Sequence, residues 1–209
     1  MSFFLNNKVA ILLAGLAAFA LSLLTWQSFF SDKKTLRQPV PAVVLMLDWH
    51  DFALKAERYS EGYRPPVAAR VYAYSGLAAW EAALPALDGK WLSLASKSPD
   101  LKLPKPEPGV KSHLPAVLNA CYSQIFQKLF IAAPRNIDQA RLSLEQKWAA
   151  QSLQEIDSLT FLASVDFGRK MALAVYEWSA TDTLGHMANL HNYDRSEEHT
   201  SELQSRGLI

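Results

Sequence analysis

Residues 67–84 read VAARVYAYSGLAAWEAAL, and this stretch decides the fold class. It follows a Pro-Pro pair, and proline suits the first turn of a helix because its missing N–H would have no partner there. Only Arg70 and Glu81 are charged, and the rest is small or apolar on every side. Such a helix is typical of the centre of a bundle, where Gly76 lets a neighbour approach closely. We therefore predict a central helix over residues 67–84.

The two charged residues of this helix need partners if they are buried. Arg70 and Glu81 are separated by three helical turns and therefore lie on one face. Burying either charge without a partner is costly. We expect each to meet a partner from another helix or from a part of the protein outside this sequence. The alternative is that both lie at a solvated edge.

Four further segments place apolar residues at helical spacing, and no segment alternates as a strand does. The predicted class is all-α, a helical bundle that we expect to be incomplete. The predicted inward residues are Leu45, Trp49, Phe52, Ala53, Ala56 and Tyr59; then Leu114, Val117, Leu118, Cys121, Ile125, Phe126 and Leu129 in a helix over His113–Ala132; then Ile137, Ala140, Leu144 and Trp148 after an Asn136 cap; and finally Phe167, Met171, Ala174 and Trp178 after a cap at Asp157 or Ser158.

A long proline-rich loop is predicted between residues 85 and 111. Its PKPEP run, residues 104–108, favours extended polyproline geometry. Irregular loops of this length are either functional or wrap around the fold.

The amino-terminal segment is strongly apolar. From Val9 to Leu24 only Ser22 is polar, and the run continues to Phe30, which reaches the roughly 20 residues that a membrane span needs. We expect an export signal or, in better keeping with this length, an uncleaved membrane anchor; a buried core helix is the alternative. Basic residues flank the run on both sides, so the positive-inside rule leaves its orientation open. The expected location is exported, periplasmic or membrane-anchored, with the membrane as partner through residues 9–30.

The last residues are of a different kind. Residues 195–205 read RSEEHTSELQS, which resembles a widely used sequencing-library adapter translated in frame. We expect residues 195–209 to be an artefactual tail that has no part in the fold; a natural polar tail is the alternative. Without the two arginines and three glutamates of this tail, the formal net charge of +1 becomes +2. This balance gives no electrostatic argument for nucleic acid, which we do not expect as a partner.

Two groups of residues contain side chains of the kinds that bind metal ions. In Asp48-Trp-His-Asp51, neighbouring helical residues diverge by about 100° and cannot converge on one ion, so we expect a solvated polar face. His186 and His191, with Asp182 and Asp194, lie in a predicted loop, which places ligands freely. They are the better candidate for a metal or phosphate site, although such residues in a terminal loop are usually solvated.

No catalytic motif is complete in this sequence. The single cysteine, Cys121, lies on an apolar stripe and is predicted to be a core residue rather than a nucleophile. There is no Ser-centred elbow, Walker loop, CxxC pair or HExxH. We therefore assign no catalytic, cofactor-binding or metal-binding residue to this chain.

Spaced motifs carry a family resemblance. Together they resemble the front half of bacterial vanadium-dependent-haloperoxidase-like proteins, of the type 2 phosphatidic acid phosphatase superfamily, over residues 47–194. The motifs are Trp49 with Ala53 and Glu57, then GYRPPVAAR at residues 62–70, YSGLAAWEAALP at 74–85, LPKPEP at 103–108 and VYEWSATD at 175–182.

The resemblance implies chemistry only for an intact parent. In that family a helical bundle holds vanadate or a phosphoryl group among a Lys and Arg motif, a Pro-Ser-Gly-His motif and a Ser-Arg…His motif, all in the carboxyl-terminal half. None of these motifs is present in this sequence, so no catalytic residue carries over to any position. The implied activity is acid phosphatase or haloperoxidase, acting on a phosphate ester or on halide and peroxide, with vanadate as a possible cofactor.

These expectations divide the chain into four parts. Residues 1–30 are a signal or anchor, 31–41 a linker, 42–194 the amino-terminal helical part of a phosphatase/haloperoxidase-like domain, and 195–209 the tail. The expected function is a truncated front half of an exported enzyme, inactive by itself. The alternative is a membrane-anchored helical interaction module without catalysis, which works through its loop at residues 97–111.

Overall fold

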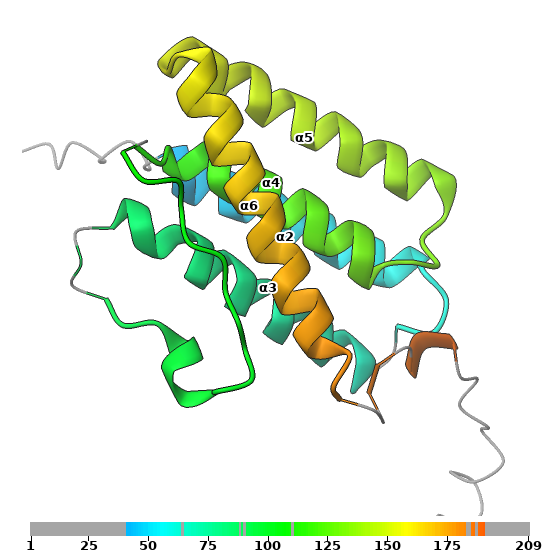
Figure 1. The fold of residues 1–209 in the computed structure, drawn as a ribbon. Coiled ribbons are helices and arrows are strands. Elements are labelled where there is room, and N and C mark those ends of the chain that lie inside the picture. Colours follow the sequence, from blue (N-terminus) through cyan, green and yellow to red (C-terminus); the bar gives the residue numbers. More distant parts are fainter. Residues whose placement is uncertain are drawn as a thin grey trace, which may run out of the picture. The chain divides into compact units, whose positions relative to one another are not determined.

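The computed structural model describes residues 41–63, 65–87, 89, 91–109, 111–182, 185–186 and 188–190. Across these residues the chain is helical and contains no strand, which confirms the all-α prediction (Figure 1). None of their helices is apolar over enough length to span a bilayer. The elements are the α-helices α2 (Pro41–Tyr59), α3 (Val67–Ala83), α4 (Leu114–Leu129), α5 (Arg135–Glu155) and α6 (Ser158–Ser179), and the 3-10 helices η1 (Leu84–Ala86), η2 (Leu94–Lys97) and η3 (Ala188–Leu190).

Three predicted segments fall elsewhere in the chain. The expected anchor of residues 1–30, residues 31–40 of the predicted linker and the tail of residues 195–209 lie outside the described residues. The last residue of the predicted linker, Pro41, is instead the first residue of α2.

The central helix is α4. It packs against α2, α3, α5 and α6, and every residue from Ala116 to Ser123 is buried (Figure 1). The prediction that α3 is the central helix is wrong, because Ala69, Ala73 and Gly76 form an exposed stripe along it. The free energy gained by burial scales with apolar area, so the large side chains of α4 take the centre, while α3 buries one face, with Ala68, Ala78, Ala79 and Ala82, and leaves the stripe in water.

An aromatic cluster joins α2 to α4. Trp49 is fully buried and stacks on Tyr122, with 6.2 Å between ring centroids. Its indole Nε1 donates a hydrogen bond to Asn119 Oδ1 at 3.1 Å, so the polar atom of the ring is satisfied inside the core. Phe52 and Phe126 pack on the same indole at 5.6 and 6.0 Å. This cluster fixes the amino-terminal helix of the described region on the central one.

Most residues predicted to face inward do so, including the fully buried Cys121. Tyr59 is an exception, because it is 59% exposed. Tyr63, from the turn after α2, covers the core in its place and packs on Phe130 with 4.9 Å between ring centroids. Ala140 is also exposed, since α5 turns the neighbouring Arg141 inward. Of the remaining predicted residues, Leu114, Leu129, Leu144, Ala174 and Trp178 are half-buried.

The predicted helix ends are right in part. Asp157 caps α6 as predicted, accepting from the backbone N–H groups of Leu159 and Thr160 at 2.9 and 3.0 Å. Asn136 does not cap α5, which begins one residue earlier and follows Pro134 without a side-chain cap. Pro134 is itself the N-cap residue, and its backbone carbonyl accepts from the N–H groups of Ile137 and Asp138 at 2.9 and 3.1 Å. The Pro-Pro pair directly precedes α3, with Pro66 at the N-cap position, and the third predicted helix ends at Leu129 rather than Ala132.

The long loop wraps around the fold. Between α3 and α4 the chain makes the short η1 and η2 helices and then runs back beside α3 (Figure 1). Leu101 is buried, and Ala95 and Leu103 pack partly buried against the core. These apolar contacts hold the loop on the helices, which is one of the two roles predicted for it.

Candidate functional site

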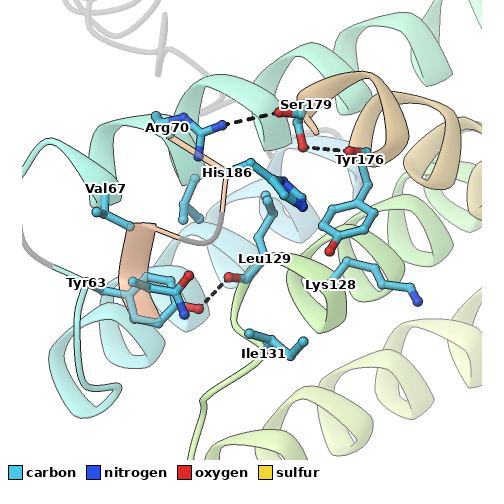
Figure 2. A pocket seen from close by; sticks show the side chains of 11 residues that line it. Tyr63, Val67, Arg70, Lys128, Leu129, Ile131, Tyr176, Ser179 and His186 are labelled. Atoms are coloured by element: carbon cyan, nitrogen blue, oxygen red, sulfur yellow. Dashed lines mark hydrogen bonds between the residues drawn. The ribbon is translucent and has the colours of Figure 1, made fainter. Parts of the chain in front are cut away.

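Two of the sequence motifs meet where α3 begins and α6 ends. Arg70, in the first turn of α3, donates from Nε to Asp182 Oδ2 at 2.8 Å. Its Nη2 donates to the carbonyl of Ser179 at 3.4 Å (Figure 2), and its Nη1 donates to the carbonyl of Gly185. Asp182 also accepts from the backbone N–H of Gly185 at 3.3 Å. We call this arrangement the Arg70–Asp182 clamp.

Two glycines allow the chain to close around the clamp. A Cβ at Gly185 would lie 2.3 Å from Arg70 Nε, so a side chain there would displace the guanidinium. Gly62 has a φ of +82°, and a Cβ on it would lie 1.9 Å from the carbonyl oxygen of Asn189. Glycine is the residue that tolerates both the left-handed backbone and such close approach. The turn after α2 and the residues after α6 therefore pack directly on each other.

A small cavity lies beside the clamp. It has a volume of about 30 Å³, which is room for one or two water molecules. Residues of α3, of the end of α4, of α6 and of η3 surround it (Figure 2). The lining residues are Tyr63, Val67, Arg70, Val71, Lys128, Leu129, Ile131, Tyr176, Ser179, His186 and Asn189.

The cavity wall is basic but carries no activated group. The lining holds Arg70, Lys128 and His186 and no carboxylate, although Asp182 neutralises Arg70 from outside the wall. The Nζ of Lys128 lies 5.9 Å from the ring centroid of Tyr176, and the His186 ring lies 5.8 Å from it. No lining residue forms the nucleophile and base pair that covalent catalysis needs.

Tyr63 is held as a neutral hydrogen-bond donor. Burial raises its pKa to about 12, because the ionised phenolate would lose its hydration. Its hydroxyl donates to the carbonyl of Leu129 at 2.5 Å, which ties the turn after α2 to the end of α4 (Figure 2). A tyrosine in this state is structural near neutral pH rather than an acid or a nucleophile.

The predicted loop site is only partly within the described residues. Asp182 is bound to Arg70, and His186 lines the cavity beside Tyr176. His191 and Asp194 lie outside the described residues, so the four-residue site stays a prediction. Where the structure describes side chains, no group of three or more His, Cys, Asp and Glu residues could hold a metal ion.

The first predicted cluster diverges as expected. Trp49 points into the core, while His50 and Asp51 are exposed. Asp48 is not simply solvated, because its Oδ2 accepts from Lys147 Nζ at 2.7 Å and from Trp148 Nε1 at 3.0 Å. This carboxylate links α2 to α5 and has a structural role.

Glu81 finds its partner in the loop. It is buried, and its two oxygens accept from Ser93 Oγ at 2.8 Å and from the N–H groups of Leu94 and Ala95 at 2.6 and 3.2 Å. The carboxylate therefore caps the amino terminus of η2. Both charges of α3 are paired as predicted, Glu81 by loop residues, and Arg70 by Asp182 and Gly185 after α6 and by Ser179, the last residue of α6.

A buried polar network was not foreseen from the sequence. Arg141 is buried on α5 and donates to Ser123 Oγ at 2.7 Å and to Asp138 Oδ1 at 2.8 Å. Ser123 in turn donates to Glu145 at 2.6 Å, and Glu145 accepts from Arg169 at 2.9 Å. The i, i+3 and i, i+4 spacing of the three charges on α5 was the available signal. The network joins α4, α5 and α6 and is structural.

Comparisons with protein-family models, with curated proteins and with solved structures give no match to this chain.

Proposed function

We propose that this chain is the front half of an exported or membrane-anchored enzyme similar to acid phosphatases and vanadium-dependent haloperoxidases. In this proposal the described helices are scaffold, and the residues that hold phosphate or vanadate lie in sequence beyond Asp194. Residues 9–30 attach the chain to the membrane or direct its export. The 209-residue chain has no turnover by itself.

The observation that carries this proposal is the Arg70–Asp182 clamp. The clamp joins two of the motifs on which the family resemblance rests, although they are far apart in sequence. Its charges neutralise each other, and the adjacent cavity of about 30 Å³ is too small for a phosphate ester. Motif residues that build a joint between helices are what a scaffold half requires.

The exposed stripe of α3 supports the same proposal. Ala69, Ala73 and Gly76 follow each other at helical spacing on the solvent side of the helix. A Cβ added to Gly76 would meet nothing within 4 Å in the described part of the chain. Small residues at such spacing admit another helix at short distance. We propose that helices of the catalytic half pack on this stripe.

Sequencing the genomic DNA past the codon for Asp194 tests the proposal. We expect the reading frame to continue into a Ser-Gly-His motif and an Arg and His pair. The extended protein should hydrolyse p-nitrophenyl phosphate, or oxidise bromide with peroxide once vanadate is added, and the 209-residue chain should do neither. A frame without these motifs would refute the enzyme assignment, and turnover by the 209-residue chain would mean that it contains a site of its own.

A membrane-anchored interaction module is the second candidate. The helices α2 to α6 share one hydrophobic core around α4, and the Arg70–Asp182 clamp ties the chain after α6 to α3. This arrangement favours a unit that folds by itself. A protein of residues 40–194 separates the two candidates by urea denaturation followed by far-UV circular dichroism. A single reversible transition supports the module, whereas aggregation at low concentration supports an enzyme half that lacks its partner helices.

A further inference from the structure

We propose that the loop at residues 91–97 binds the surface of an anionic lipid bilayer. The side chains of Trp91, Leu92 and Leu94 are 57%, 84% and 49% exposed, and they follow one another within this short loop. We call residues 91–97 the aromatic loop. It projects beside α3 in the excursion between α3 and α4 (Figure 1).

The aromatic loop is held in this exposed shape by specific contacts. The rings of Trp80 and Trp91 meet edge to face with 5.6 Å between centroids, and Trp80 Nε1 donates to the carbonyl of Leu92 at 3.2 Å. The buried carboxylate of Glu81 accepts from Ser93 and from the N–H groups of Leu94 and Ala95, which fixes the start of η2 to α3. The exposed apolar side chains therefore form a preorganised tip, which loses little conformational freedom on binding.

Tryptophan and leucine together favour a lipid interface over open water. The amphipathic tryptophan ring partitions to the level of the lipid headgroups, and leucine contributes apolar area to the outer acyl region. The other large apolar residues that are exposed in the described chain lie on helix faces, such as Leu162 on α6, except for Ile131 in the turn after α4, and none of them is a tryptophan. Only isolated apolar exposure is normal for a soluble surface, whereas a contiguous tip indicates a binding site.

The charge around the loop fits an anionic surface. Residues 85–111 contain five lysines against two aspartates and one glutamate. In the described structure Lys97, the last residue of η2, is exposed within the aromatic loop, and Lys102, Lys105 and Lys111 are exposed along the segment that follows it. Lysines near a membrane surface are attracted by phosphatidylserine-type and phosphatidylglycerol-type lipids. This inference does not depend on the proposed enzyme identity.

A fluorophore on the loop tests the proposal in the 209-residue chain. Leu92→Cys is labelled with the environment-sensitive dye NBD, and Leu162→Cys, 63% exposed on α6, is the matched control. The native Cys121 is fully buried and stays unlabelled in the folded protein. Each labelled protein is mixed with vesicles of phosphatidylglycerol and phosphatidylcholine. If residues 9–30 are an anchor, they attach both labelled proteins to the vesicles equally.

The expected result is specific to the loop. The emission of the Leu92 label should shift to the blue and rise about twofold or more as it leaves water, and lipids with a nitroxide near the headgroup should quench it. The Leu162 label should change in neither respect. Vesicles of phosphatidylcholine alone should give a smaller shift at Leu92, because the lysines lose their counter-charge.

Three outcomes would overturn the proposal. A water-like spectrum at Leu92 while the protein sediments with vesicles shows that the loop does not touch lipid. A blue shift without vesicles that grows with protein concentration shows that a second copy of the chain covers the loop. Equal shifts at Leu92 and Leu162 show that the lipid contacts both sites alike and that the loop is not the binding surface. In each case the genomic test of the proposed function stands or fails separately.

Discussion

Arg70 and Glu81 illustrate how single residues decide the fold of this chain. Each is a charge on an otherwise apolar helix. Asp182, which follows the end of α6, neutralises Arg70, and hydrogen bonds from the loop after α3 satisfy Glu81. Arg70 binds a carboxylate and carbonyls, whereas Glu81 binds backbone N–H groups. The choice follows from chemistry, because a guanidinium offers five donors and a carboxylate only accepts. These contacts fasten the two long irregular stretches to α3.

Arg70→Ala should destabilise the protein by about 1–3 kcal/mol, because it leaves Asp182 and two carbonyls without their donor. The expected value is moderate because both side chains of the pair are partly exposed. Arg70→Lys should recover only part of the loss, since an ammonium cannot reproduce the planar fork. Urea denaturation measures the change.

Lys170→Ala is the control for this prediction. Lys170 forms an exposed i, i+4 pair with Asp166, which should contribute no more than about 0.5 kcal/mol. If Arg70→Ala and Lys170→Ala have equal effects, the clamp is an ordinary surface pair.

At the scale of the helices, two glycines lie in opposite surroundings. Gly168 of α6 faces α4, and a Cβ on it would lie 2.3 Å from the carbonyl oxygen of Val117. Gly76 of α3 faces open space in the described structure. A helix can therefore carry glycine either for close packing or for no reason visible in its surroundings. The sequence alone does not separate these cases.

Gly168→Ala should destabilise the protein by about 1–3 kcal/mol, since the methyl group forces α4 and α6 apart. Gly76→Ala should stabilise the 209-residue chain by about 0.5–1 kcal/mol, because alanine is the better helix former and meets no obstacle. Thermal unfolding of both variants measures the signs. In an extended protein Gly76→Ala should become destabilising if another helix packs on this stripe, and an unchanged gain would argue against such packing.

The start of α6 gives a pH dependence. Hydrogen bonds from Thr160 and from backbone N–H groups lower the pKa of Asp157 below its ordinary value. A lowered pKa in the folded state contributes stability above the unfolded pKa, and this contribution disappears as pH falls through the folded value. We therefore expect a loss of stability under acid conditions, below the ordinary aspartate range, that comes from this cap.

Thermal unfolding between acid and neutral pH tests the cap. Asp157→Ala should lower the melting temperature at neutral pH, and its difference from the native protein should shrink as the pH falls. Asp157→Asn should lose less at neutral pH, because its amide oxygen still accepts from the N–H groups. A difference between native and Asp157→Ala proteins that stays constant over the pH range would contradict the assignment.

At the scale of the whole molecule, α4 organises the described fold. Four helices cover it, and its burial is continuous from Ala116 to Ser123 (Figure 1). In contrast, α5 buries Ile137, Arg141, Trp148 and Ser152 along one narrow line. Such unequal coverage should make local stability unequal as well.

Hydrogen exchange followed by mass spectrometry checks this expectation. Peptides from residues 116–126 of α4 should exchange slowest, with protection on the order of tenfold or more above peptides from the middle of α5. The cause is that exchange in α4 requires four helices to separate, whereas α5 can open alone. Fastest exchange in α4 would mean that the central position of this helix is wrong.

Much of the fold follows from the sequence by itself. The apolar spacing determined five helices, the Asp157 cap and the burial of Trp49 and Cys121, because these depend on local geometry and on a helical period within one segment. The sequence also contains no complete catalytic motif of the kinds sought, a Ser-centred elbow, a Walker loop, a CxxC pair or HExxH.

Only the tertiary structure decided which helix is central and which residues share a site. Side-chain volume, summed over neighbours from other helices, placed α4 inside and left Ala69, Ala73 and Gly76 of α3 in water. The pairing of Arg70 with Asp182 and the basic wall shared by Lys128 and His186 join residues far apart in the chain. No local pattern encodes such contacts, because they depend on how the helices pack.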